Sequence, residues 1–566
     1  MSYKPLILIF AVLLNINLFA QHNEEVTVEG TYRPKVNKVD KILMQAETPE
    51  QSFTMPSADV QILEIQKRIP MKLDRINAMT LNKKDGLNEK FTKNFLMAGL
   101  GTRLTPVFFY KHHSMLTKTL GLGVGIDHYS SWMGMKDYAY SGFMNNRFDI
   151  ALSSTRFNNL QLRGNLYYDN DVVHYYGVPL QDWTGSDAAL EQAAPRQTYN
   201  TIGLRLAMAS TTTRRGEFYH NGDFDYHYMF ALLGGSEHYS ALNYDLGYME
   251  SWWGKRDNPQ KAGVKLSFEY DSYAGGAHSP KVHVRRYLGK VNPYFEMKDE
   301  FFRLHLGLCM GLASRIHSMD RLLTVHPDLK GSLFVLDKKV EFYAGLNGGR
   351  KIYTLGEMVA ENPFVTSDLD MEMTTVKLGF EGGVRTNLMQ TLDVHAGVRY
   401  RHTLNDPFYS VISQSNAVQN AFEVIYDDTR LVSVLADVRW LAWDKITVDA
   451  GLVINRYKNE VLDCALYRPR TEGKLKVNYE FNDQLSLYSS FLYQGGRFGR
   501  LDPVLACTPS FKLSPVLDLG IGADYKVRDE LTVFAKFNNL LHQKYLLYVN
   551  YPVTGIEFFA GVKMRF

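Results

Sequence analysis

The chain has 566 residues and a formal net charge of +3, with 63 Lys and Arg against 60 Asp and Glu. This near-neutral balance gives no basic surface of the kind that binds nucleic acid, so we expect no nucleic-acid partner. Three cysteines in so long a chain rule out a disulfide-rich scaffold.

The first 20 residues have the pattern of a secretory signal peptide. One positive charge, Lys4, precedes an apolar run over Leu6–Leu14, and the small residue Ala20 suits the cleavage position. The apolar run is too short for a membrane anchor, and two asparagines interrupt it. We expect residues 1–20 to be removed on export, and no later stretch is apolar enough for a transmembrane helix.

Residues 21–93 form an N-terminal extension of a different character. The stretch is polar, contains prolines at 34, 49, 56 and 70, and shows little alternation. It predicts extended chain with one short helix near 59–68.

From residue 94 to the end, apolar and polar side chains alternate with the period of two that marks β-strands. In the last strand Phe558, Val562 and Met564 share one face, while Lys563 and Arg565 share the other. The stretches are about 9–12 residues long, which suits a tilted membrane-spanning strand. Full charges in mid-strand would be costly in a soluble core but can face a water-filled lumen. The pattern predicts an all-β, antiparallel transmembrane barrel over 94–566, with residues 21–93 in the periplasm or in the barrel lumen.

The predicted connections alternate between tight turns and long loops. Asn and Asp occupy many of the tight turns, where left-handed backbone is common. Long loops are expected at 171–197, 353–373, 404–430 and 497–514. This asymmetry is typical of bacterial outer-membrane barrels, with short turns and both termini periplasmic.

We count about 22 strands, an even number as such barrels require. The expected ranges are 94–103, 106–116, 119–131, 139–154, 159–175, 198–211, 217–231, 239–251, 262–274, 283–298, 300–313, 321–336, 339–353, 374–386, 391–403, 431–440, 444–457, 470–481, 484–496, 515–527, 530–542 and 554–566.

The segment Glu530–Phe566, "ELTVFAKFNNLLHQKYLLYVNYPVTGIEFFAGVKMRF", resembles the end of a TonB-dependent receptor. It has a strand, an Asn-rich turn, a Tyr-Pro stretch and a final strand that closes on an aromatic residue. The resemblance implies that Phe566 seals the barrel and is the signal read by the outer-membrane assembly machinery. The signal peptide and its Ala20–Gln21 junction resemble those of Bacteroidota proteins.

The N-terminal extension departs from that family. The segment Glu24–Lys35 resembles the opening of a receptor plug or the energy-coupling box before it, so Glu25, Val26, Thr27 and Val28 form a candidate coupling segment. No complete plug domain is present after it. Residues 21–93, inward-folded loops or a partner protein must therefore fill the lumen.

Three classes of function are consistent with these observations. The first is a surface receptor or transporter for a nutrient, with TonB or surface lipoproteins as candidate partners. The second is a plugless barrel that serves as a subunit or scaffold of an outer-membrane assembly or secretion complex. The third is a gated diffusion channel. In each case we expect contact with outer-membrane lipid and lipopolysaccharide.

No catalytic, cofactor or metal motif is found, so we expect no enzyme activity and no cofactor. The adjacent His112 and His113 fall on opposite faces of one strand. The tryptophans at 132, 183, 252 and 253 fit either ligand stacking or the aromatic girdle of a barrel. Cys464 and Cys507 lie in neighbouring predicted outer loops, and we expect them to form a disulfide.

Overall fold

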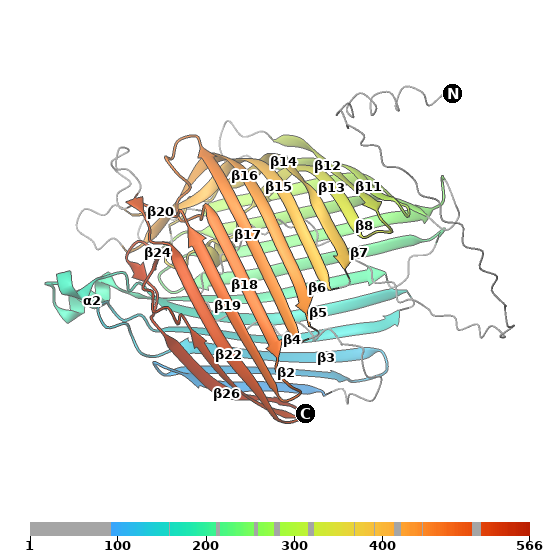
Figure 1. Ribbon diagram of the computed structural model, residues 1–566. Coiled ribbons are helices and arrows are strands. Elements are labelled where there is room, and N and C mark those ends of the chain that lie inside the picture. Colours follow the sequence, from blue (N-terminus) through green and yellow to red (C-terminus); the bar gives the residue numbers. More distant parts are fainter. Residues whose placement is uncertain are drawn as a thin grey trace, which may run out of the picture. The chain divides into compact units, whose positions relative to one another are not determined.

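The computed structural model describes residues 92–566, except for residues 158, 211–214, 254–258, 277–282, 315–321, 367, 390, 413–419, 444 and 501–510. Twenty-two antiparallel strands form one sheet that closes on itself, because the first strand pairs with both the second and the last. Figure 1 shows the tilted strands around the barrel. The barrel strands are β1 Asn94–Gly101, β2 Thr105–Met115, β3 Leu120–Ser131, β4 Phe143–Phe157, β5 Leu160–His174, β6 Arg196–Ser210, β7 Phe218–Ala231, β8 Ser236–Glu250, β9 Gln260–Ala274, β10 His283–Lys298, β11 Phe302–Ala313, β12 Leu323–Val335, β13 Val340–Ile352, β14 Met373–Met389, β15 Leu392–Val411, β16 Phe422–Ala442, β17 Ile446–Asn459, β18 Thr471–Glu480, β19 Leu485–Gly495, β22 Val516–Arg528, β23 Leu531–Asn538 and β26 Glu557–Arg565.

The remaining elements all lie in long connections. They are the helices η1 Leu180–Asp182, α2 Asp187–Ala193 and α3 Leu355–Glu361, and the strand pairs β20 Phe498–Gly499 with β21 Phe511–Lys512 and β24 Leu546–Tyr548 with β25 Tyr551–Pro552. Among the described residues, no helix is both long enough and apolar enough to cross a membrane.

The 22 strands expected from the sequence are confirmed, with one clear error. The sequence predicts a long loop over 404–430, but β15 runs to Val411 and β16 starts at Phe422. Both faces of these extensions are buried, as Phe408 and Phe422 show from opposite faces, so packing against other loops extends the pairing. Burial at this end of the barrel therefore overrides the local turn signals.

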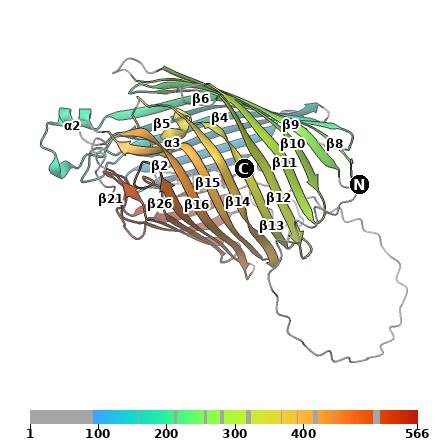
Figure 2. The same ribbon diagram turned by 90° about the horizontal axis from the view of Figure 1, so that it is seen from above.

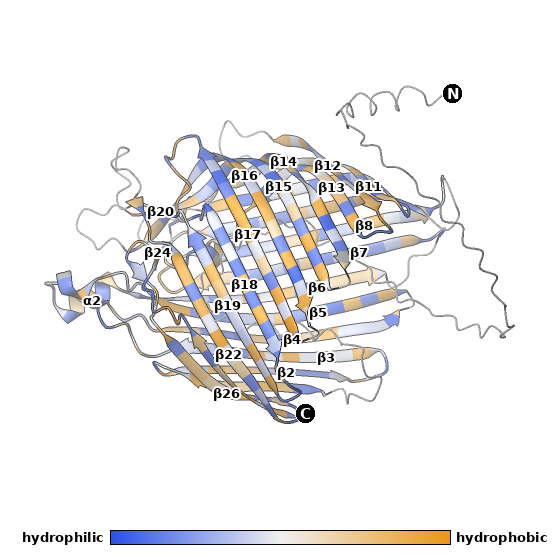
Figure 3. Cartoon of the chain, viewed as in Figure 1, coloured by the Kyte–Doolittle hydropathy of each residue, from blue (hydrophilic) through white to orange (hydrophobic). Residues whose placement is uncertain are grey.

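The two faces of the strands differ as a membrane barrel requires. Figure 3 shows apolar and polar residues alternating along the strands. Large apolar side chains such as Leu152, Leu206 and Phe268 stay exposed on the outer face, whereas Glu269 and Lys290 form an ion pair on the inner face at 2.7 Å. An apolar exterior with a charged interior is the arrangement of a transmembrane β-barrel.

The short turns use left-handed backbone at polar residues, as the sequence indicated. Asn159 has φ of 63° between β4 and β5, and Asp337 has φ of 54° between β12 and β13. The first residue of β1 and the last residue of the chain meet at the same end of the barrel. The backbone N–H of Asn94 donates to the Phe566 carbonyl at 2.8 Å, and the Phe566 N–H donates back to the Asn94 carbonyl at 3.1 Å.

Closure of the seam depends on a pair of glycines. Gly99 of β1 lies opposite Gly561 of β26, and the Phe534 ring packs over both. A Cβ on Gly561 would overlap the backbone carbonyl of Ala98, which cannot move without breaking the seam.

We therefore expect Gly561→Val to prevent barrel closure. The measurement is the fraction of chain that shows the heat-sensitive gel mobility of a folded barrel in outer-membrane fractions. Ala560→Val is the matched control, because that residue lies one position away on the opposite face of β26. Equal folded fractions for the two variants would contradict the prediction.

Candidate functional site

The long loops meet over the barrel mouth, and the central one is the connection between β13 and β14. We call residues 353–372 the α3 loop. Figure 2 shows α3, the short helix of this connection, in the view from above. The loop receives hydrogen bonds from strands far around the wall, since Tyr199 of β6 donates to Pro363 and Glu237 of β8 accepts from Leu355. A segment held from such separated strands must cross the mouth.

The sequence of the α3 loop specifies its short helix. Thr354 is the N-cap, and its hydroxyl accepts the Glu357 N–H at 3.1 Å. The Glu357 carboxylate accepts the Thr354 N–H in return at 3.2 Å, which completes a capping box. Leu355, Met358 and Val359 are buried, so the helix packs its apolar side into the protein.

Two charged side chains of the wall anchor the start of this loop. Glu237 is fully buried and accepts the Leu355 N–H at 2.6 Å and the Gly356 N–H at 3.4 Å, which places its charge at the free N–H groups of the first helical turn. Arg286 of β10 is also fully buried, and its guanidinium donates to the carbonyl of Tyr353 at 2.8 Å and of Glu372 at 2.9 Å. Arg286 therefore holds both stems of the α3 loop.

A buried carboxylate pairs with the guanidinium of Arg286. Asp271 of β9 accepts from Arg286 at 2.9 and 2.6 Å, and both side chains are fully buried. The hydroxyl of Tyr273, two residues along β9, accepts the N–H of Leu369 in the α3 loop at 3.1 Å. One patch of wall over β8, β9 and β10 thus fixes the loop through four residues.

An aromatic core joins the α3 loop to the other loops. The Phe364 ring stacks on Tyr551 of the last loop, with centroids 3.7 Å apart and planes at 19°. Tyr176, which follows β5, packs edge-on against both rings. Tyr548 donates to the Glu361 carbonyl at 2.7 Å. We call this assembly the loop cap; its members are the described residues of the α3 loop and the segments 175–178, 404–412, 420–422, 460–470 and 545–553.

An ion pair and side-chain hydrogen bonds also join the segments of the loop cap. Arg468 makes a two-pronged ion pair with Asp406 at 2.5 and 2.9 Å, and its guanidinium lies over the Phe408 ring. Asn420 donates to the carbonyl of Tyr175 at 2.8 Å, and Tyr175 donates to the Val365 carbonyl at 2.6 Å. Side-chain bonds to loop carbonyls satisfy backbone groups that no strand ladder pairs.

The cap tyrosines are protected from ionisation. Burial raises the pKa of Tyr175 from 10.0 to about 12, although hydrogen bonds from Tyr199 and Gln197 partly oppose the shift. Burial also raises the pKa of Tyr548 and of Tyr551 well above 10.0. A raised pKa means that the closed cap favours the neutral phenol.

We therefore expect the loop cap to loosen at alkaline pH. The contribution of the buried Tyr175 phenol to the stability of the cap is fully present below pH 10.0 and is lost as the pH rises through about 12. In this range the phenol ionises more readily in an opened cap than in the closed cap. Tyrosinate absorbance and protease cleavage of the loops should rise together in this window, while circular dichroism still reports an intact barrel. Cleavage that does not change up to pH 12 would contradict this expectation.

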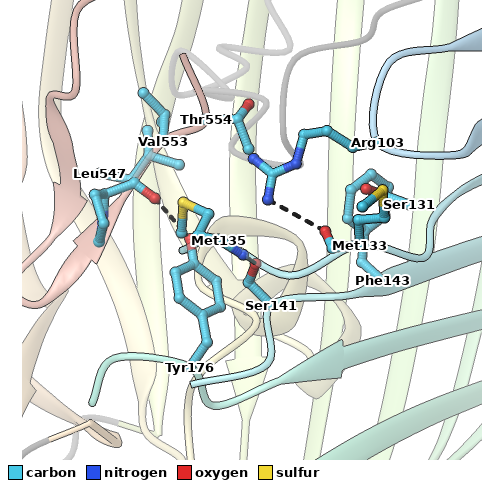
Figure 4. A pocket seen from close by; sticks show the side chains of 11 residues that line it. Arg103, Ser131, Met133, Met135, Ser141, Phe143, Tyr176, Leu547, Val553 and Thr554 are labelled. Carbon is cyan, nitrogen blue, oxygen red and sulfur yellow. Dashed lines mark hydrogen bonds between the residues drawn. The ribbon is translucent and has the colours of Figure 1, made fainter. Parts of the chain in front are cut away.

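A small pocket opens beside the aromatic core (Figure 4). Arg103 points into it from the β1–β2 turn and donates to the Met133 carbonyl at 3.2 Å. Tyr176 forms another part of its wall and donates to the Pro552 carbonyl at 2.9 Å. The other lining residues are Ser131, Met133, Met135, Ser141, Phe143, Leu547, Pro552, Val553 and Thr554. The accessible space is about 10 Å³, room for about one water molecule, so the pocket is too small to be a ligand site as it stands.

The inner wall below the cap carries a network of charges. His305 contacts the Glu296 carboxylate at 2.9 Å and the Asp328 carboxylate at 3.1 Å. Lys261 lies 3.6 Å from Glu296 and 3.9 Å from Asp245. In the described ranges, no group of three or more His, Cys, Asp or Glu could hold a metal ion. These charges largely pair with one another across neighbouring strands.

The candidate coupling segment and the two candidate disulfide cysteines lie in different parts of the chain. Glu25, Val26, Thr27 and Val28 lie outside the described residues, as do the signal peptide and the predicted helix near 59–68. Cys464 is buried in the loop after β17, and Cys507 lies outside the described residues, so their disulfide stays a prediction.

The tryptophans divide between the two ends of the barrel. Trp252 and Trp253 follow β8 at the short-turn end and pack around the outward-facing Phe295, with centroids 6.0 and 5.4 Å apart. Trp440 and Trp443 pair at 6.0 Å at the same end. These positions match an aromatic girdle. Trp132 and Trp183 lie at the long-loop end.

Sequence reasoning did not identify Glu237, Asp271 and Arg286 as a unit. The signal available to it was the placement of three charges close to the long-loop ends of adjacent strands. Register decided their meeting, because Asp271 lies directly opposite Arg286 and two positions along β9 from Tyr273, the partner of Glu237.

The fold and the site define a class: a closed 22-strand transmembrane β-barrel whose long-loop end is covered by its own loops. No known protein family and no curated protein matches the sequence. Solved structures do match.

The siderophore receptor PirA from Acinetobacter baumannii matches with a TM-score of 0.63 at 11% identity, over 84% of this chain and 80% of PirA. The ferric-catecholate import receptor Fiu from E. coli K12 gives 0.59 at 10% identity, over 84% and 82%. The copper transporter OprC gives 0.58 at 14% identity, over 84% and 82%. The likeness establishes that this chain has the barrel fold of such receptors.

Proposed function

We propose that this chain is an outer-membrane receptor that takes up a nutrient, with its long loops at the cell surface. The observation that carries the proposal is the α3 loop, which closes the mouth of a wide barrel and is anchored from the wall by Arg286 and Glu237. A wide lumen would leak if it were open. A closure made of loops suits a barrel that opens only for its ligand.

The comparisons support this reading at the level of the fold. The three proteins named above are described as an import receptor, a siderophore receptor and a transporter. By analogy, ligand capture takes place on the outer side of the loop cap. Passage into the lumen then requires the α3 loop to leave the wall.

Energy coupling is part of the proposal and rests on the sequence. Glu25, Val26, Thr27 and Val28 would contact the TonB protein in the periplasm. Replacing these four residues by a Gly-Ser stretch should abolish uptake without lowering the amount of folded barrel. Unchanged uptake in that variant would argue for an uncoupled channel.

The direct test is a growth assay in the native host. A strain that lacks this chain is grown on media that each supply a single, poorly permeant source of iron or carbon. Loss of growth on one source, restored by the wild-type chain, supports uptake. Growth equal to the parent strain on every source would overturn it.

A second candidate is a structural subunit of an outer-membrane complex, and α2 favours it. This helix has no buried residue, and the neighbouring Leu180 is 40% exposed, so the β5–β6 loop presents surface that contacts little of the barrel. Figures 1 and 2 show α2 projecting beyond the strands. Gentle purification from native membranes separates the two candidates, because a stoichiometric protein partner is expected only for a subunit.

A further inference from the structure

Three polar side chains meet on the inner wall of the barrel just below the loop cap. Arg399 and Arg401 lie on the inner face of β15, because the alternate residue Val398 is 45% exposed on the outer face. Tyr457 of β17 shares the inner face, since Leu431 of β16 lies directly opposite both Arg401 and Tyr457. The three strands are neighbours in the sheet (Figure 1). We call Arg399, Arg401 and Tyr457 the lumen cradle.

The lumen cradle has hydrogen-bonding groups that the described residues leave unused. The guanidinium of Arg401 forms no hydrogen bond and no ion pair with any of them, and the Tyr457 hydroxyl has no hydrogen-bond partner among them either. Nε of Arg399 is buried without a hydrogen-bond partner, and it lies 4.0 Å from the Glu381 carboxylate. Unused donors in a partly desolvated place are costly, so the cradle favours a ligand that can accept from them.

The strand register explains why Arg401 has no partner in the wall. Opposite it are Gly379 on β14 and Leu431 on β16, and neither has a side chain that can accept a hydrogen bond. The carboxylate of Asp406 is close, but Arg468 already binds both of its oxygens. Arg401 is therefore left facing the lumen as an uncompensated cation.

The charges around Arg401 reinforce this effect. The charged groups that act most strongly on it include the guanidiniums of Arg399 and Arg468, which repel it, and the carboxylate of Asp406, which attracts it. Two cations thus stand against one anion that is already paired. Such a place attracts an anion from solution, because a nearby negative charge stabilises all three guanidiniums.

Other cations of the inner wall are paired directly. Arg205 donates to Asp225 at 3.0 Å, and Lys290 donates to Glu269 at 2.7 Å. The lumen cradle differs from these pairs in position as well, since Tyr353, the first residue of the α3 loop, is a close neighbour of Arg401. A group that passes the α3 loop into the lumen would meet the cradle on entry.

We propose that the lumen cradle binds a carboxylate or phosphate group of the imported nutrient once the α3 loop has left the wall. Two guanidiniums side by side offer forked N–H donors that match the oxygens of either group, and the Tyr457 hydroxyl adds a further donor. The inference rests on the proposed function for the passage of a nutrient, and it adds the chemical class of that nutrient, an oxyanion.

The test is isothermal titration of the full chain, purified in detergent at low salt, with citrate, pyrophosphate or glucose. The wild type should bind at least one of the two oxyanions and should not bind glucose. Binding of citrate alone assigns the cradle to carboxylates, and binding of pyrophosphate alone assigns it to phosphates. Arg399→Gln with Arg401→Gln should weaken the binding about tenfold or more, because hydrogen bonds between charged groups are the strong ones.

Matched variants separate the cradle from the general charge of the lumen. Arg147→Gln with Arg205→Gln removes the same charge from arginines that already pair with Asp169 and Asp225, and it should leave the affinity unchanged. Arg401→Lys keeps the charge without the fork, so it should bind more tightly than Arg401→Gln and less tightly than the wild type. Heat-sensitive gel mobility confirms that each variant is folded.

Any of three outcomes would overturn the inference: a wild type that binds neither oxyanion, an affinity that the Arg399 and Arg401 variant retains, or an equal loss in the Arg147 and Arg205 control. The titration does not depend on growth. Oxyanion binding by the cradle together with normal growth of the deletion strain on every source would reject nutrient uptake and leave the cradle standing. Uptake that the Arg399 and Arg401 variant supports at the wild-type rate would leave uptake standing and reject the cradle.

Discussion

Replacing residues 355–370 by a short Gly-Ser linker should turn the closed barrel into a conducting pore. The replacement removes α3, the Phe364 ring that stacks on Tyr551, and the carbonyl groups to which Tyr175 and Tyr548 donate. The loops that remain lose their shared core, because each contributes only a few side chains to it. The strands keep their ladder hydrogen bonds, so the barrel itself should stay folded.

The measurement is single-channel conductance of the full chain in planar bilayers, together with the sensitivity of cells to a large antibiotic that the outer membrane normally excludes. We expect the wild type to stay closed and the replacement to conduct. Deletion of residues 187–192 is the control, because α2 buries no residue and the deletion keeps Ala193, whose carbonyl accepts from Asn420 of the loop cap at 2.6 Å. A wild type that conducts steadily would favour a diffusion channel, and a replacement that stays closed would show that the α3 loop is not the closure.

The second large effect is expected from Arg286→Met. This change removes the hydrogen bonds to Tyr353 and Glu372 and leaves the Asp271 carboxylate buried without its cation. Removing one partner of a buried ion pair costs about 3–5 kcal/mol. Much of this cost is relieved if the α3 loop leaves the wall and water reaches Asp271, so we expect the open state to become populated.

Protease cleavage within the α3 loop and antibiotic sensitivity are the two readouts for this variant. Lys290→Met is a matched control, since Lys290 is on the same strand and inner face and its ion pair with Glu269 does not touch the loop. Adding Asp271→Leu to Arg286→Met should restore part of the protection, because it removes the unpaired charge. Equal cleavage of Arg286→Met and Lys290→Met would show that Arg286 is not the clamp.

The growth assay and these two variants address different steps. Growth on single nutrient sources asks whether anything is imported, whereas conductance asks only what closes the mouth. A chain that fails the growth assay but opens on removal of the α3 loop would be a closed barrel with another role, and α2 would then be the first surface to examine for a partner.

The strands were predictable because a barrel strand is defined by its own neighbours along the sequence. Alternation places Val432 and Val434 outward and Ser433 inward without knowledge of any other strand. The tight turns were predictable for the same reason, since Asn159 and Asp337 adopt left-handed backbone locally. β15 and β16 run furthest beyond the sequence prediction, because their tips are buried against other loops.

Period-two patterning and local turn chemistry were enough to specify the strand count, the membrane-facing surface and the existence of long loops at one end. What those loops do depends on contacts between distant parts of the chain. Glu237, Asp271 and Arg286 come from three strands, and Phe364 and Tyr551 are far apart in the sequence. No local pattern encodes their meeting, because register and closure of the ring of strands bring them together.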